Sequence, residues 1–144
     1  MPKIVFDSNR CTGCRACEGA CKQEHNLPVG TRRRIVSYMQ AGEYPKLSRV
    51  YKSNACKHCS KPKCMEACPA SAITKNSASG IVDVNKDECI GCRACIDACP
   101  FNAMSFEIDE QKASKCNYCK ERLAQGVNPA CVNVCMGLAL SWKE

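Results

Sequence analysis

The chain has 144 residues and a formal net charge of +7, because 21 lysines and arginines outnumber 14 acidic residues. Sixteen residues are cysteine and only 6% are aromatic, so side-chain packing alone cannot build a large core, and crosslinks or metal centres must add stability. No apolar segment is long enough for a membrane helix, and the first residues, MPKIVFDSNRC, lack the apolar run of a secretory signal. We therefore expect a cytoplasmic protein without direct membrane insertion, although export together with a partner subunit stays open.

The cysteines fall into four groups of four along the chain, and none is left over. Groups one and three share one spacing, with two, two and three residues between successive cysteines. The intervals are two, four and three residues in group two, and two, eleven and three in group four. In chain order the groups are Cys11, Cys14, Cys17 and Cys21; Cys56, Cys59, Cys64 and Cys68; Cys89, Cys92, Cys95 and Cys99; and Cys116, Cys119, Cys131 and Cys135.

Short apolar segments flank these groups in a repeated pattern. The apolar residues at 4–6, before group one, match those at 82–84, before group three, and both predict a short strand. In groups two, three and four, an alanine lies four residues after the last cysteine and is followed by a larger apolar residue. This pattern predicts a second strand. We expect a helical turn to begin near each last cysteine, with Pro69 and Pro100 in its first turn, where no backbone donor is needed.

Residues 28–55 lie between groups one and two and predict an inserted hairpin. The segments RIVSYMQ and SRVYK can pair around AGEYPKL, whose Gly42 and Pro45 suit a turn. The run Arg32, Arg33 and Arg34 at its start is more typical of a solvated strand edge than of a docking site.

The spacing of groups one and three is typical of a 4Fe–4S site. One C-x2-C-x2-C loop can place three thiolates around one face of the cluster, while small residues let its backbone N–H groups approach the sulfides. These small residues are Gly13, Ala16, Gly91 and Ala94. The fourth cysteine follows three residues later and serves the other cluster of a pair, so such groups are expected in even numbers.

Two other uses of cysteine compete with this interpretation. A disulfide framework is possible for any even cysteine count, but cysteines this close together rarely pair, and cytosolic thiols stay reduced. Zinc is the stronger competitor, because C-x2-C pairs form zinc knuckles, and groups two and four alone would leave it open. Groups one and three, with Pro100 after the last cysteine of group three, favour iron–sulfur clusters.

The remaining residues near the cysteines have less specific interpretations. Because sixteen cysteines already fill all the ligand positions, we expect His25 and His58 to support the clusters indirectly or to face solvent. Arg15 and Arg93 occupy equivalent places in groups one and three; each either raises the reduction potential of a cluster or is a solvated loop residue.

The basic charge does not indicate nucleic-acid binding. Four oxidised 4Fe–4S clusters with their thiolates carry about −2 each, which brings the net charge from +7 to about −1. The sequence contains no known nucleic-acid motif and no basic patch interleaved with aromatic residues. We therefore expect no nucleic-acid partner.

With all four groups in place, the chain resembles the four-cluster ferredoxin-type electron-transfer subunits of molybdenum or tungsten pterin oxidoreductases. Such subunits accompany enzymes of the dimethyl sulfoxide reductase type, and a compact form accompanies some bacterial tungsten aldehyde oxidoreductases. The resemblance covers nearly the whole chain and lies in CKHCSKPKCMEACPASAI, GIVDVNKDECIGCRACIDACPFNAM and KCNYCKERLAQGVNPACVNVC. Lys22 and Met136 depart from it, since a proline often follows the last cysteine in ferredoxins.

The resemblance implies four ligand sets, which we call quartets 1 to 4, each drawing cysteines from two groups. Quartet 1 is Cys11, Cys14, Cys17 and Cys135; quartet 2 is Cys21, Cys116, Cys119 and Cys131; quartet 3 is Cys56, Cys59, Cys64 and Cys99; quartet 4 is Cys68, Cys89, Cys92 and Cys95. All sixteen would bind iron, in four 4Fe–4S clusters that form a linear electron path in this order, with quartet 1 nearest the catalytic subunit.

The expected fold is α+β, with two ferredoxin-like modules of short strands, short helices and long loops around the clusters. Residues 1–27 and 104–144 would form module 1, residues 28–55 the inserted hairpin, and residues 56–103 module 2. No nucleophile–base pair or phosphate-binding loop is present, so we expect no catalytic residues and no enzyme activity of its own.

The expected function is electron transfer in a hetero-oligomer, between a molybdenum- or tungsten-pterin catalytic subunit and a flavin subunit, a soluble ferredoxin or another external partner. A free-standing soluble polyferredoxin is the alternative, and an iron–sulfur storage protein is a third class. The sequence does not identify the substrate, the metal of the partner enzyme, the cluster potentials or the direction of electron flow.

Overall fold

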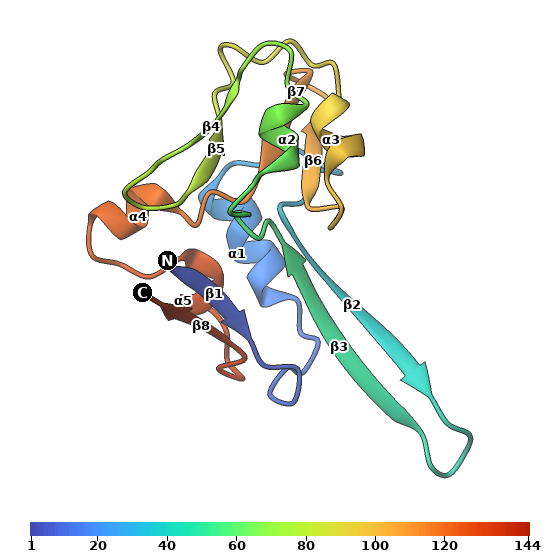
Figure 1. Ribbon diagram of the computed structural model, residues 1–144. Helices are drawn as coiled ribbons and strands as arrows, with labels where there is room; N and C mark the ends of the chain where they lie inside the picture. Colours follow the sequence, from blue (N-terminus) through green and yellow to red (C-terminus); the bar gives the residue numbers. More distant parts are fainter.

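The computed structural model describes residues 1–144 and contains many short elements of both kinds, consistent with the α+β class (Figure 1). The strands are β1 (Lys3–Phe6), β2 (Arg34–Ala41), β3 (Ser48–Ala55), β4 (Ile73–Lys75), β5 (Val82–Val84), β6 (Met104–Glu107), β7 (Lys112–Lys115) and β8 (Leu140–Lys143). The helices are α1 (Ala16–Glu24), α2 (Lys63–Glu66), α3 (Ala94–Ala98), α4 (Lys120–Ala124) and α5 (Ala130–Asn133). None of these helices has the length and apolar character needed to span a lipid bilayer.

The strands form four separate antiparallel pairs. Three are local hairpins, β2–β3, β4–β5 and β6–β7. The fourth joins the two ends of the chain, because β1 pairs with β8 in a register that places Phe6 opposite Leu140. Groups one and four are thereby brought to the same part of the molecule although they are far apart in sequence (Figure 1).

The β2–β3 hairpin occupies the segment between groups one and two and projects from the body of the molecule (Figure 1). Its eight-residue strands pair in register from Arg34 opposite Ala55 to Ala41 opposite Ser48. Residues 37–50, which include the turn, are all exposed, whereas the base of the hairpin is partly buried. The base therefore packs with the cysteine-bearing body, and the tip does not.

The apolar core is small, with only 29 of 144 residues buried. Its largest cluster joins Ile73 and Val82, from the β4–β5 hairpin, to Cys95 of α3 and to Met104 and Ala113, from the β6–β7 hairpin. Further cysteines pack against this cluster at its partly buried rim. Because cysteines form part of this small interior, we expect the stability of the fold to depend on what the thiols bind.

The sequence suggested that a helical turn begins near the last cysteine of each group, and this prediction is wrong. In groups two and three the helix lies before that cysteine: α2 ends at Glu66 and α3 at Ala98, and each proline stands in the turn that follows. A residue before proline is disfavoured in the helical region, and Cys99, which precedes Pro100, is extended with ψ 111°. In group one Lys22 follows the last cysteine, and α1 continues past it to Glu24.

Candidate metal centres

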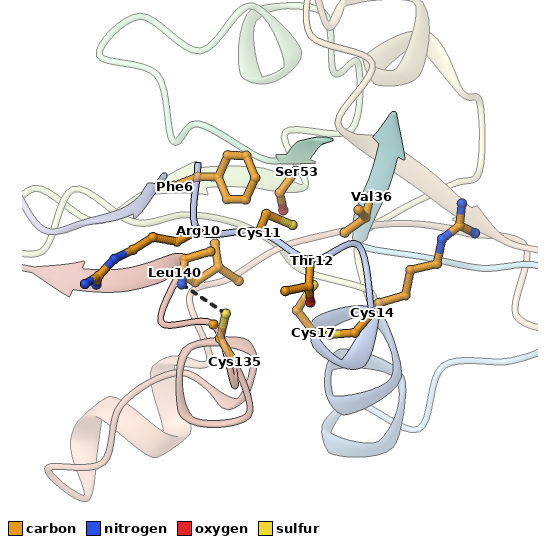
Figure 2. A pocket seen from close by; sticks show the side chains of 13 residues that line it. Phe6, Arg10, Cys11, Thr12, Cys14, Cys17, Val36, Ser53, Cys135 and Leu140 are labelled. Atoms are coloured by element: carbon orange, nitrogen blue, oxygen red, sulfur yellow. Dashed lines mark hydrogen bonds between the residues drawn. The ribbon is translucent and has the colours of Figure 1, made fainter. Parts of the chain in front are cut away.

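Quartet 1 surrounds a largely apolar hollow at the base of the β2–β3 hairpin (Figure 2). Cys11, Cys14 and Cys17 reach it from the loop before α1 and from the first turn of α1. Cys135 reaches it from the opposite side, from the turn between α5 and β8, so the pairing of β1 with β8 brings the fourth thiol to the other three. The hollow is further lined by Val36 and other side chains.

Quartets 3 and 4 line two similar hollows. One is bordered by Cys56, Cys59, Cys64 and Cys99, and the other by Cys68, Cys89, Cys92 and Cys95. Including the part open to solvent, the empty volumes around quartets 1, 3 and 4 are about 370, 360 and 320 Å³. Each hollow thus receives three thiols from one group and one from another, and the three spaces are of similar size.

Quartet 2 is the one set whose four cysteines are all buried: Cys21, Cys116, Cys119 and Cys131 are each no more than 9% exposed. Burial, reinforced by the neighbouring thiols of the other three, raises the pKa of Cys21 to about 12. Burial likewise raises the pKa of Cys119 to about 11. Because such thiols hold their protons in the absence of metal, iron must displace the protons when it binds.

A backbone amide supports the last cysteine of groups two, three and four in the same way. The N–H of the alanine four residues later donates to the cysteine sulfur: Ala72 to Cys68 at 3.3 Å, Ala103 to Cys99 at 3.4 Å, and Ala139 to Cys135 at 3.2 Å. Hydrogen bonds to sulfur help set the reduction potential of an iron–sulfur cluster. The repeated alanine step in the sequence marks these donors, although by itself it predicts only the start of a strand.

The loops of groups one and three share an unusual backbone conformation. Gly13 and Gly91 have φ of 71° and 73°, and the arginines two residues later, Arg15 and Arg93, are also left-handed. A Cβ on Gly13 would lie 2.2 Å from the side-chain ring of Tyr51, which would have to shift, and the positive φ also favours glycine. Both arginines are exposed, and they line the hollows of quartets 1 and 4.

The prediction that the arginine run is a solvated strand edge is wrong for two of its members. Arg34 is only 5% exposed, and the side chain of Arg33 is 11% exposed and donates from Nε to the Ser114 hydroxyl. Only Arg32 is well exposed. The strand packs its first residues against the cysteine-bearing body, which sequence spacing could not reveal.

Two buried cations lie among the thiols without a carboxylate partner. Burial disfavours the charged form of Arg34, but the neighbouring Cys131, Cys116 and Cys17 outweigh this effect and raise its pKa. The Lys115 ammonium, 2% exposed, donates to the backbone oxygens of Val82 and Cys116. Neither cation forms an ion pair with a carboxylate. Buried charges normally require compensation, so this arrangement fits an anionic group held by the cysteines.

Both histidines lie next to the thiols, and neither simply faces solvent. His25 Nε2 lies 3.4 Å from Cys119 Sγ, at the edge of quartet 2. His58 is 5% exposed, accepts a hydrogen bond at Nδ1 from the Val82 N–H, and stacks on the ring of Tyr118. These contacts are compatible with the predicted indirect role of both histidines. No feature of the sequence predicted the contact between His58 and Tyr118.

The donor set fits iron–sulfur clusters. All sixteen cysteines are free thiols, so none is used in a disulfide. No group of three or more His, Cys, Asp or Glu converges closely enough to hold one metal ion; the thiols of quartets 1, 3 and 4 instead surround hollows. Thiolates spread around a space, with amide donors and buried cations beside them, match the needs of an anionic cluster.

Comparisons with known proteins agree with this fit. Residues 47–144 match the model of a family described as 4Fe-4S dicluster domain, and residues 2–23 match one described as 4Fe-4S binding domain. Protein NrfC of Escherichia coli (strain K12) is 38% identical over 141 residues, which are 96% of this chain and 63% of that relative. The 144 residues thus span less than two thirds of NrfC.

Two further relatives have more descriptive names. The B subunit of polysulfide reductase from Wolinella succinogenes is 39% identical over 144 residues, 98% of this chain and 75% of the relative. The B subunit of anaerobic dimethyl sulfoxide reductase from Haemophilus influenzae is 37% identical over 148 residues, 96% of this chain and 72% of the relative. These matches confirm the resemblance to iron–sulfur subunits and the 4Fe–4S cofactor: the protein belongs to the 4Fe–4S dicluster family of ferredoxin-type proteins.

Proposed function

We propose that the chain is a non-catalytic electron-transfer subunit, with one 4Fe–4S cluster in each quartet and therefore four in all. Its partner would be a molybdenum- or tungsten-pterin catalytic subunit, and electrons would be exchanged with a flavin subunit, a soluble ferredoxin or another external carrier. Two relatives are named as the B subunits of a polysulfide reductase and of a dimethyl sulfoxide reductase, which supports membership of a multi-subunit oxidoreductase. We place the complex in the cytoplasm, with export beside a partner as the alternative.

The observation that carries the proposal is the difference in solvent exposure between the cysteines of the end quartets and those of the middle quartets. Quartets 1 and 4 each contain an exposed thiol, Cys14 and Cys92 respectively. Quartet 2 is entirely buried, and the cysteines of quartet 3 are of intermediate exposure. Exposed ends and a protected middle suit a relay that exchanges electrons with partners at both ends.

Neighbouring side chains support the order 1, 2, 3, 4. The pKa of Cys17 of quartet 1 is raised to about 11, chiefly by burial, and Cys131 of quartet 2 lies close enough to contribute to this rise. Cys116 of quartet 2 and Cys56 of quartet 3 pack in one apolar cluster. Quartets 3 and 4 share the larger apolar core. Each quartet therefore adjoins the next.

We further propose the division into two ferredoxin-like modules, with quartets 1 and 2 in one and quartets 3 and 4 in the other. The β6–β7 hairpin connects them: Met104 and Ala113 pack in the core beside quartets 3 and 4. Cys116, which follows β7 directly, belongs to quartet 2. A hairpin shared in this way would fix the spacing between the two modules.

Anaerobic co-purification tests the proposal. The protein is isolated from its host without exposure to oxygen, its partner is identified, and iron, labile sulfide, molybdenum, tungsten and flavin are measured. We expect about four irons per quartet and a partner that contains molybdenum or tungsten. A monomer with reversible clusters would favour the free-standing polyferredoxin, and a protein that contains zinc but no labile sulfide would overturn the proposal.

A further inference from the structure

His58 and Tyr118 occupy equivalent positions in two C-x2-C loops, one from group two and one from group four. Both have left-handed backbones, with φ of 47° and 58°. In each loop the residue's own N–H donates to the sulfur of the first cysteine, His58 to Cys56 and Tyr118 to Cys116, both at 3.4 Å. The two loops thus present a matched pair of side chains.

The two side chains meet. Their ring centroids are 3.7 Å apart with the planes inclined by 36°, and each residue is 5% exposed. Burial, followed by the thiols Cys116, Cys56 and Cys59, raises the pKa of Tyr118 to about 12, so this ring lies beside cysteines of both quartets. The pair stands where quartet 2 adjoins quartet 3, which is the only step of the proposed path between modules.

The hydrogen bonding of His58 is incomplete. Its Nδ1 accepts from the Val82 N–H at 3.0 Å, so that nitrogen carries no proton and the neutral ring carries its proton on Nε2. Nε2 is buried and has no hydrogen-bond partner. A buried donor without an acceptor is destabilising, because it loses its hydrogen bond to water and gains none in the protein. Packing alone explains a stacked pair, but it does not explain a donor left unpaired beside two ligand sets.

We propose that the His58–Tyr118 stack is the contact through which electrons pass between quartets 2 and 3, and that His58 Nε2–H donates to a sulfur of a cluster at this junction. This inference rests on the proposed electron-transfer function. With clusters bound in quartets 2 and 3, one electron would leave the reduced cluster and reach the oxidised one; no bond would be broken and no proton would move. His58 and Tyr118 therefore act as positioning residues.

Four variants of the anaerobically prepared holoprotein test the two parts separately. Tyr118→Phe keeps the ring and removes the hydroxyl, Tyr118→Leu removes the ring, and His58→Phe keeps a ring but removes the donor. Tyr38→Leu is the matched control, because Tyr38 also packs against another aromatic ring, that of Tyr51, but on the hairpin away from the junction. Two quantities are measured: the rate of internal equilibration after photochemical injection of one electron, and the midpoint potential of each cluster by electron paramagnetic resonance.

The expected results differ among the variants. Tyr118→Leu slows equilibration about tenfold, as loss of a supporting partner of a metal site does, while Tyr118→Phe and Tyr38→Leu leave it unchanged. His58→Phe lowers the equilibrium constant for reduction of one junction cluster about tenfold, which corresponds to a midpoint potential about 59 mV lower. The reason is that a hydrogen-bond donor to sulfur favours the reduced state. The clusters of quartets 1 and 4 keep their potentials.

Unchanged rates in Tyr118→Leu and unchanged potentials in His58→Phe would overturn the inference, as would an equal loss of rate in Tyr38→Leu. If the Tyr118→Leu variant does not bind its clusters, the midpoint potentials of the His58→Phe variant decide whether the inference stands. The proposed function fails separately, if the parent protein itself shows no reversible one-electron titration.

Discussion

Substitution of Cys135 by serine tests the crossed assignment of the cysteines to quartets. Cys131 and Cys135 lie four residues apart in group four, yet they would bind different clusters, quartet 2 and quartet 1. The sulfur of Cys135 accepts a hydrogen bond from the Ala139 N–H at 3.2 Å, and a serine oxygen can accept the same bond. The substitution therefore removes a thiolate and leaves the local turn intact.

The size of the effect follows from the sixteen thiols in four sets. Complete loss of the quartet 1 cluster lowers the iron and labile sulfide content by about a quarter, whereas loss of one iron lowers the iron content by about one-sixteenth. We expect a value between these limits for Cys135→Ser. The damaged cluster is the one bound by group one, more than a hundred residues away, and the cluster bound by the rest of group four stays intact.

The assay compares electron paramagnetic resonance spectra of reduced Cys135→Ser, Cys17→Ser, Cys131→Ser and Cys21→Ser, with iron and sulfide measured on the same samples. We expect the first two variants to lose one signal and the last two to lose another. If Cys131→Ser and Cys135→Ser lose the same signal, each group binds its own cluster and the crossed assignment is wrong.

Three further changes have defined outcomes. Gly13→Ala places a Cβ 2.2 Å from the Tyr51 ring at φ 71° and should lower the free energy of unfolding, measured by anaerobic thermal unfolding, by at least about 1–2 kcal/mol. Gly19→Ala, with nothing within 4 Å of the added Cβ, should raise the free energy of unfolding by up to about 1 kcal/mol. Equal effects of the two substitutions would refute the reasoning. Arg34→Met should lower the midpoint potential of the quartet 1 or quartet 2 cluster by roughly 60 mV, because reduction adds negative charge beside a lost cation, whereas the exposed Arg32→Met should change neither. Oxidative removal of the iron should unfold most of the chain, seen as loss of far-ultraviolet circular dichroism; a retained spectrum would show that packing alone holds the fold.

The sequence predicted the elements next to the cysteines better than the side chains between them. Strands at 3–6 and 82–84 follow from apolar residues repeated ahead of the same motif, and a repeated motif reports directly on a repeated local structure. The predicted position of the helices is wrong because Pro69 and Pro100 do not open a helix; each instead ends the helical region before it.

Burial of the charged residues could not be predicted from the sequence. Lys115 and Arg34 look like ordinary surface cations in a basic chain, and only the tertiary arrangement buries them. The His58–Tyr118 contact also joins two loops distant in sequence. Local spacing contains no information about such long-range contacts, whereas it determines how one loop can present three sulfurs.

The pairing of β1 with β8 has a consequence for biosynthesis. Cys11, Cys14 and Cys17 leave the ribosome early, but Cys135 and the strand that positions it follow about 120 residues later, which takes roughly 6–24 s at typical rates of synthesis. In the proposed assignment quartets 3 and 4 are complete by Cys99, so their clusters would be inserted while the later residues are still being added. We therefore expect quartets 3 and 4 to be filled before quartet 1, and we expect the thiols of group one to need protection from oxidation until Cys135 has been made.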